Sequence, residues 1–148
     1  MAAGDAGDTV GGAQAGFAVM MAIGIGARSL VPVHDIEAAI VKAERAVGAS
    51  VQVVATFADA AFVDSLKDAA KRTTRALALL PLAALQLRSG ECQTTSERSQ
   101  TLFGVASIAE AAALAAAGTG STLVLPRLTC GYVTVAVAQS LDALDGNT

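Results

Sequence analysis

The sequence predicts an α/β fold, a three-layer α/β/α sandwich around a mostly parallel, mixed central sheet of about five strands. Short apolar or β-branched segments alternate with segments of helical periodicity, an order typical of parallel strands joined by helices. The last two strand-like segments are separated only by Pro126–Tyr132, and so short a connection favours an antiparallel pair. The length of 148 residues suits one domain, which we expect over residues 17–140 between a flexible leader (1–16) and a flexible tail (141–148).

The first elements are two strands and two helices in alternation. Phe17–Ile25 is a continuous apolar run, which indicates a strand covered on both faces. Apolar residues then recur at helical spacing from Ile36 to Val47, and Gly48 stands where a helix ends. Val51–Thr56 is short and β-branched, and Phe62–Thr73 is amphipathic with helical spacing. The pattern predicts a β-α-β-α beginning.

The middle of the chain is less regular. Ala76–Leu80 predicts a third strand that stops at Pro81, and Leu82–Leu87 predicts a short helix. Arg88–Thr101 is polar and has no apolar periodicity. Such an interval is either an ordered functional loop or a disordered connection, and its composition favours the second.

A buried helix and two strands complete the domain. Ser107 and Glu110 match the S-x-x-E capping box, and the helix that follows is apolar almost all round as far as Gly118. We expect this helix to be buried, with its small alanine side chains allowing a close approach to the sheet. Thr122–Leu125 and Val133–Ala138 predict the final strand pair.

Composition excludes several classes of function. Apolar residues make up 53% of the chain, but the apolar runs are shorter than the roughly 20 residues a membrane-spanning helix needs. No basic region precedes the first apolar run, so we expect no signal peptide and a cytoplasmic protein without a membrane partner. The net charge is −3 and no Lys/Arg block is present, which argues against nucleic-acid binding. Cys92 and Cys130 are widely spaced and there is one histidine, so we expect neither a metal site nor a cofactor.

Ligands of open α/β sheets bind beyond the carboxyl ends of the strands, so residues that follow strands are the site candidates. Gly24 and Gly26 precede Arg28, which could clamp an anion, although spacing alone favours glycines of a tight turn. Thr56 ends the second strand and Asp59 lies in the turn after it, where Asp59 is either a general acid/base or a turn residue.

Two further groups of candidates lie later in the chain. Pro126 and Arg127 follow the fourth strand, and Arg127 could meet an anionic ligand. The capping box explains both Ser107 and Glu110, and no nucleophile elbow surrounds Ser107, so we reject a serine-hydrolase triad. His34 stands just before a helix and is expected at the surface.

Six segments, in their order and spacing, resemble the CobE family of cobalamin biosynthesis, which is homologous to the C-terminal domain of CbiG. They are GIGARS (Gly24–Ser29), VATFADAA (Val54–Ala61), TTSERS (Thr94–Ser99), GVASIAEAAALAAAG (Gly104–Gly118), LVLPR (Leu123–Arg127) and VTVAVA (Val133–Ala138). The positions that the resemblance assigns to a ligand site are Gly24, Gly26, Arg28, Ser29, Thr56, Asp59, Ser96, Arg98, Gly104, Ser107, Glu110, Pro126 and Arg127.

The resemblance implies a role in building the corrin ring of vitamin B12, with a corrin or precorrin intermediate of the oxygen-dependent pathway bound or carried. It leaves two alternatives. One is hydrolysis of a precorrin-5A-type lactone with release of a two-carbon fragment, for which Asp59 or Glu110 would be the acid/base. The other is a structural partnership with a corrin methyltransferase or another enzyme of the pathway. Ala60 stands where the family often has a basic residue, a departure that weakens catalysis more than binding.

Overall fold

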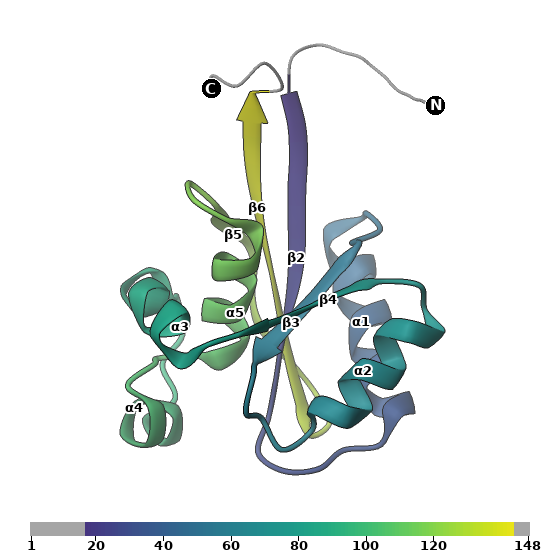
Figure 1. Ribbon diagram of the computed structural model, residues 1–148, viewed down its shortest axis with the longest axis vertical. Coiled ribbons are helices and arrows are strands. Elements are labelled where there is room, and N and C mark those ends of the chain that lie inside the picture. Colours follow the sequence, from purple (N-terminus) through teal and green to yellow (C-terminus); the bar gives the residue numbers. More distant parts are fainter. Residues whose placement is uncertain (1–16, 144–148) are drawn as a thin grey trace.

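The structure is a computed structural model that describes residues 17–143, and its centre is a five-stranded mixed sheet (Figure 1). The strands are β2 (Phe17–Ala27), β3 (Val53–Phe57), β4 (Ala76–Leu80), β5 (Thr122–Cys130) and β6 (Val133–Ala143), in the spatial order β4-β3-β2-β6-β5. β2, β3 and β4 are parallel, and β6 runs antiparallel to both of its neighbours. The expected mixed sheet and its final antiparallel pair are confirmed.

The boundaries of the outer segments differ from expectation or lie outside the description. β6 extends to Ala143, past the domain boundary expected at residue 140. The expected leader (1–16) and the rest of the expected tail (144–148) lie outside the described residues.

Helices cover both faces of the sheet, which confirms the three-layer sandwich. α1 (Val33–Val47) and α2 (Val63–Arg72) lie on one face, on the right of Figure 1. α5 (Ile108–Ala117) lies on the other face against β2 and β6, with α3 (Leu82–Arg88) packed on its outer side and α4 (Glu97–Phe103) nearby. Among the described residues no single helix is long and apolar enough to span a membrane; α4 and α5 reach that length only together, across a 65° bend.

The two faces of the sheet are packed with side chains of different size. Under α1 and α2 the core holds large apolar residues, among them Ile23, Ile40 and Phe62. Under α5 it is built mainly from alanines of β2, β6 and the helix itself. Residues of α5 are buried nearly all round, as its sequence predicts. Small side chains on both surfaces bring α5 unusually near the sheet.

Gly24 marks the point of closest approach between α5 and β2. A Cβ added at Gly24 would lie 1.8 Å from the carbonyl oxygen of Ala109 and 2.7 Å from the backbone nitrogen of Ala113. Both are backbone atoms of the helix, so no side chain could rotate away. Gly24 is therefore required by packing between helix and sheet, and the anion-binding interpretation does not apply to it.

The polar interval 88–101 is not the disordered connection that its composition favours. It contains a 3₁₀ turn, η1 (Ser89–Glu91), and most of α4. Ser96 begins α4 by accepting a hydrogen bond at Oγ from the Ser99 backbone N–H (3.3 Å). The prediction failed because α4 buries no residue and therefore shows no apolar stripe. Its cap also lacks the acidic third residue of a capping box.

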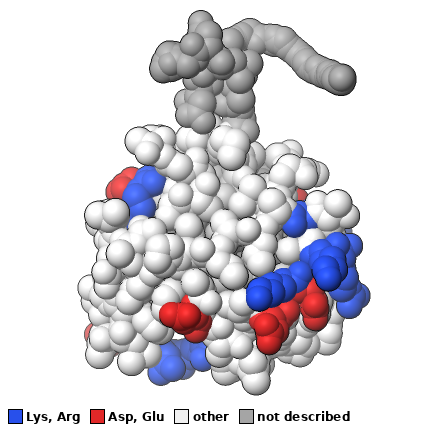
Figure 2. Space-filling model, viewed as in Figure 1, with Lys and Arg blue, Asp and Glu red and all other residues white. Residues whose placement is uncertain are grey.

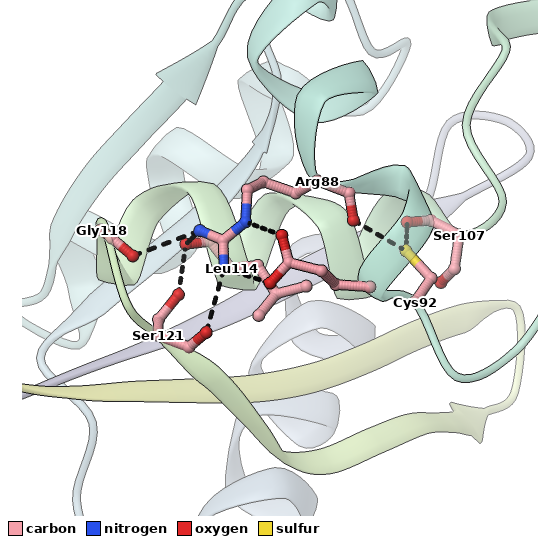
Figure 3. A network of polar contacts seen from close by, with 7 residues as sticks. Arg88, Cys92, Ser107, Leu114, Gly118 and Ser121 are labelled. Carbon is pink, nitrogen blue, oxygen red and sulfur yellow. Dashed lines mark hydrogen bonds and ion pairs between the residues drawn. The ribbon is translucent and has the colours of Figure 1, made fainter.

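Arg88 ties this interval to the far end of α5 (Figure 3). Its guanidinium donates to the carbonyl oxygens of Leu114 (2.9 Å), Gly118 (3.2 Å) and Ser121 (3.0 Å). It also pairs with both carboxylate oxygens of Glu91, at 2.6 and 2.8 Å. A cation at the C-terminal end of a helix is favourable, because the last carbonyl groups carry partial negative charge. Arg88 is therefore a structural residue of the α3–α5 packing.

Candidate functional site

A cleft of about 550 Å³ lies at the carboxyl ends of the parallel strands. Its walls are the segments that follow β2 and β3, the turn between β5 and β6, and α4. β2 lies between a parallel neighbour, β3, and an antiparallel one, β6. The connections after β2 and β3 cross one face of the sheet, and the connection from β4 to β5 crosses the other face to the far side of β2. The strand order thus reverses next to the cleft, which is where open α/β sheets hold their ligands. We take this cleft as the candidate site.

Three arginines from distant parts of the sequence line the cleft. Arg28 follows β2, Arg98 lies on α4 and Arg127 lies in β5. None of their guanidinium groups forms an ion pair with another residue of the described range 17–143. Arg28, Arg98 and Arg127 thus come together around one cleft. Such a group of cations suits an anionic ligand.

The cleft also has an apolar wall. Phe57 and Phe103 contact each other with ring centroids 5.5 Å apart at an interplanar angle of 60°. Ile108, at the start of α5, also lines the cleft, as does Tyr132 in the β5–β6 turn. Tyr132 is 86% exposed, so its ring is accessible to a ligand in the cleft. Arginines beside an exposed ring suit a ligand that is both flat and anionic.

The other predicted residues divide between the cleft and the scaffold around it. Those that line the cleft with the arginines are Gly26, Ser29, Asp59 and Ser96. Those that the structure places elsewhere are Gly24, Thr56, Gly104, Ser107, Glu110 and Pro126. Thr56, for example, is buried and donates from Oγ1 to the Ile25 carbonyl oxygen at 2.7 Å. Gly104 ends α4 in the left-handed region, with φ 68°.

The expected position of Pro126 and Arg127 after a strand is wrong. Both lie inside β5, which continues to Cys130. Between Leu125 and Leu128 the pairing with β6 shifts register, so the strand bulges there. A bulge re-aims side chains, which explains how Arg127 reaches the cleft from mid-strand.

The capping-box interpretation of Glu110 is also wrong. Ser107 Oγ accepts from the Glu110 N–H at 3.3 Å, as a cap should. The Glu110 carboxylate, however, does not return to the start of the helix. Its Oε1 accepts from the backbone N–H groups of Gln93 (2.8 Å) and Thr94 (3.0 Å), and its Oε2 from that of Arg127 (2.7 Å). Glu110 is fully buried, and its carboxylate joins two loops that are distant in sequence.

Cys92 lies near this carboxylate and is a poor nucleophile. Burial raises the pKa of its thiol to about 11, and the negative charge of Glu110 adds to the shift. The thiolate, which is the reactive form, is therefore scarce at neutral pH. Within residues 17–143, no group of three or more His, Cys, Asp or Glu side chains is placed to hold a metal ion.

Thiol alkylation at increasing pH tests the environment of Cys92. In a Cys130→Ser variant, the rate should rise about tenfold per pH unit above neutrality and level off near the folded pKa. In urea the rate should level off at about pH 8.5, which is the pKa of an unperturbed thiol. Because the folded pKa is the higher one, the folded state holds this proton more tightly, and stability should fall as the pH rises toward 11. Identical profiles with and without urea would contradict the assignment.

A second, shallower depression of about 460 Å³ lies at Arg88, Glu91 and residues 119–122. It is at the other end of α5, and the guanidinium that borders it is already bonded to Glu91 and to three carbonyl groups. It therefore offers little free hydrogen-bonding capacity to a ligand.

The sequence reasoning missed the apolar half of the cleft. Neither Phe57 nor Phe103 was a candidate, and Tyr132 was placed only at the end of the Pro126–Tyr132 connection. Aromatic residues at the ends of elements on the ligand edge were the available signal. Figure 2 shows that much of the visible surface carries no charged side chain.

Comparison with known proteins gives consistent matches. A family described as "Cobalamin synthesis G C-terminus" matches residues 21–138. The crystal structure of CobE, a protein from the cobalamin (vitamin B12) biosynthetic pathway, superposes with a TM-score of 0.76 at 23% identity, covering 82% of this chain and 91% of that one. Cobalamin biosynthesis protein chiG from Agrobacterium tumefaciens str. C58 superposes with a TM-score of 0.66 at 35% identity, covering 80% and 97%. No curated protein sequence matches significantly.

Proposed function

We propose that the cleft of this chain, which belongs to the cobalamin synthesis G C-terminus family and is thus a protein of cobalamin biosynthesis, binds a corrin or precorrin intermediate. In this proposal the protein holds the intermediate as a ligand or passes it on. Corrin intermediates are flat, largely apolar rings that carry carboxylates around the rim. A protein that binds one needs an apolar surface and cationic donors at its edge.

The observation that carries this proposal is the convergence of Arg28, Arg98 and Arg127 on one cleft. The chain has a net charge of −3, so a general excess of positive charge does not account for the grouping. The three residues come from a loop, a helix and a bulged strand, and each needs its own backbone arrangement to reach the cleft. Next to them, Phe57, Phe103 and Tyr132 supply the apolar surface.

Titration with hydrogenobyrinic acid, followed by absorbance and protein fluorescence, tests binding. We expect a saturable shift that weakens as salt is added, because exposed charges are screened. Arg28→Ala and Arg127→Ala should each weaken binding about tenfold, since a hydrogen bond to a charged group contributes about 1.5–3 kcal/mol.

Arg45 provides the control for this titration. It is exposed on α1 and does not line the cleft, so Arg45→Ala changes net charge equally but should leave affinity unchanged. If the three variants lost affinity equally, the loss would reflect only the change in net charge and not a contact with the ligand. No spectral shift with wild-type protein would contradict ligand binding and favour a role as a partner of another pathway enzyme.

Asp59 supports a second candidate function. It lines the same cleft as the arginines, so a carboxylate is available beside a bound ligand. In this candidate the chain hydrolyses a precorrin-5A-type lactone and releases a two-carbon fragment. Mass spectrometry of a lactone-bearing precursor after incubation distinguishes the two. Turnover that Asp59→Asn abolishes would favour the hydrolase, and binding without turnover would favour the carrier.

A further inference from the structure

Two arms of the cleft carry one arginine each and contain no fully buried residue. The first, called here the α4 arm, comprises residues 93–104 and carries Arg98. Its helix has no buried residue. The second, the β5 bulge, comprises residues 125–128 and carries Arg127 at the point where the ladder to β6 is irregular. Phe103 of the α4 arm and Leu125 and Leu128 of the bulge pack against the core, but they belong to two separate apolar clusters. These core contacts therefore do not join the two arms to each other.

Glu110 links the two arms through their backbones. Its Oε1 receives the N–H groups of Gln93 and Thr94 at the start of the α4 arm, and its Oε2 receives the N–H of Arg127 in the bulge. The three distances, 2.8, 3.0 and 2.7 Å, are those of well-formed N–H···O hydrogen bonds.

Glu110 itself belongs to a helix that is buried on nearly every side. It lies in the first turn of α5, which Ser107 caps and which packs on β2 at Gly24. Its side chain is fully buried, and a carboxylate near the N-terminal end of a helix is favoured by the helix dipole. The carboxylate is thus a fixed point to which both arms are attached.

The number of donors explains why the residue is an acid. Three N–H groups approach the two oxygens from two sides. A glutamine has one acceptor oxygen, and its NH₂ group would face either the Arg127 N–H or those of Gln93 and Thr94. Glutamine therefore preserves the shape of the side chain but can hold only one arm.

We propose that Glu110 is a positioning residue, which holds the α4 arm and the β5 bulge together and so sets the spacing of Arg98 and Arg127 across the cleft. The part that concerns ligand affinity rests on the proposed function; the link between the arms does not. Glu110 does not line the cleft, so it acts on a ligand through the two arginines and not by contact.

Amide hydrogen exchange on the full chain tests the link without a ligand. In Glu110→Gln, exchange should become at least tenfold faster in one arm or both, and in Glu110→Ala in both arms together, while β2 and β3 stay unchanged. Ser140→Ala is the matched control, because Ser140 is buried and its Oγ bonds to Ala117 at the other end of α5 (2.8 Å). It should leave both arms protected. If either variant at residue 110 fails to fold, Glu110→Asp, which keeps both oxygens on a shorter stem, replaces it and should loosen the arms less.

Titration with hydrogenobyrinic acid tests the consequence for affinity. Glu110→Gln should weaken binding about tenfold, and Arg98→Ala or Arg127→Ala should cost less in that background than in wild type, because the arginines have already lost their spacing. Protected arms in Glu110→Ala, or wild-type affinity in folded Glu110→Gln, would overturn the proposal. If wild-type protein binds no corrinoid, the proposed function fails, and the exchange result alone decides the role of Glu110.

Discussion

Replacing Gly24 with alanine is expected to lower the free energy of unfolding by about 3 kcal/mol, at the upper end of the usual cost of overpacking. The added Cβ would lie 1.8 Å from the Ala109 carbonyl oxygen, so α5 would have to move away from β2. The helix cannot tilt freely, because it also packs against β6 and β3. Moving it would disturb the alanine-rich layer over much of its length.

Urea unfolding followed by circular dichroism measures this loss, and Gly90 supplies the control. A Cβ at Gly90 would have no heavy atom within 4 Å, and the residue does not have a positive φ. Gly90→Ala should therefore be neutral or slightly stabilising, through the unfolded chain. Equal stability of the Gly24 and Gly90 variants would show that α5 can shift at little cost.

Arg88→Ala should also destabilise the protein strongly, by about 3 kcal/mol, since hydrogen bonds from charged donors contribute about 1.5–3 kcal/mol each and part of the loss is recovered by solvation. Its guanidinium serves three carbonyl groups at the end of α5 and its approach to β5 (Figure 3). Arg88→Lys should recover little of the loss, because one ammonium group lacks the planar fork of donors.

Arg72 is the control for this experiment. Its side chain is 63% exposed and makes an ion pair with Glu37 at 3.0 Å. Exposed pairs of this kind contribute less than about 1 kcal/mol, so Arg72→Ala should change the urea midpoint little. If the Arg72 and Arg88 variants lose equal stability, the carbonyl contacts of Arg88 contribute nothing beyond its charge.

Local patterns in the sequence predicted most of the fold. The end of α1 at Gly48 is one case, since a left-handed residue after a helix favours glycine and Gly48 has φ 71°. The start of α5 at Ser107 is another. Both depend on neighbours within one helical turn. α4 was missed because it has no buried face, so its sequence lacks the apolar residues at helical spacing that indicate a helix.

The candidate site was predicted in part, for a related reason. The rule that ligands bind beyond the carboxyl ends of strands placed Arg28 correctly, but Arg127 lies inside β5 and reaches the cleft through the bulge. The partners of Glu110 lie 16 and 17 residues away, and which backbone groups it meets depends on how two loops fold over α5. The need for glycine at residue 24 likewise depends on where α5 crosses β2. Contacts between segments that are distant in sequence do not produce a periodic pattern in the sequence.

The position of β6 has a consequence for the order in which the molecule folds. β6 is the last described strand in sequence, yet it lies inside the sheet and pairs with β2 from Phe17↔Ala143 to Ala27↔Val133. Until it arrives, β2 has an unpaired edge, and closing that edge requires contacts of very high sequence separation, which slow folding. During synthesis, β2, β3 and β4 emerge first and must wait for β6 with an apolar edge exposed. The two sides of the cleft, one carrying Arg28 and the other Arg127, come together in the same late step that closes the sheet.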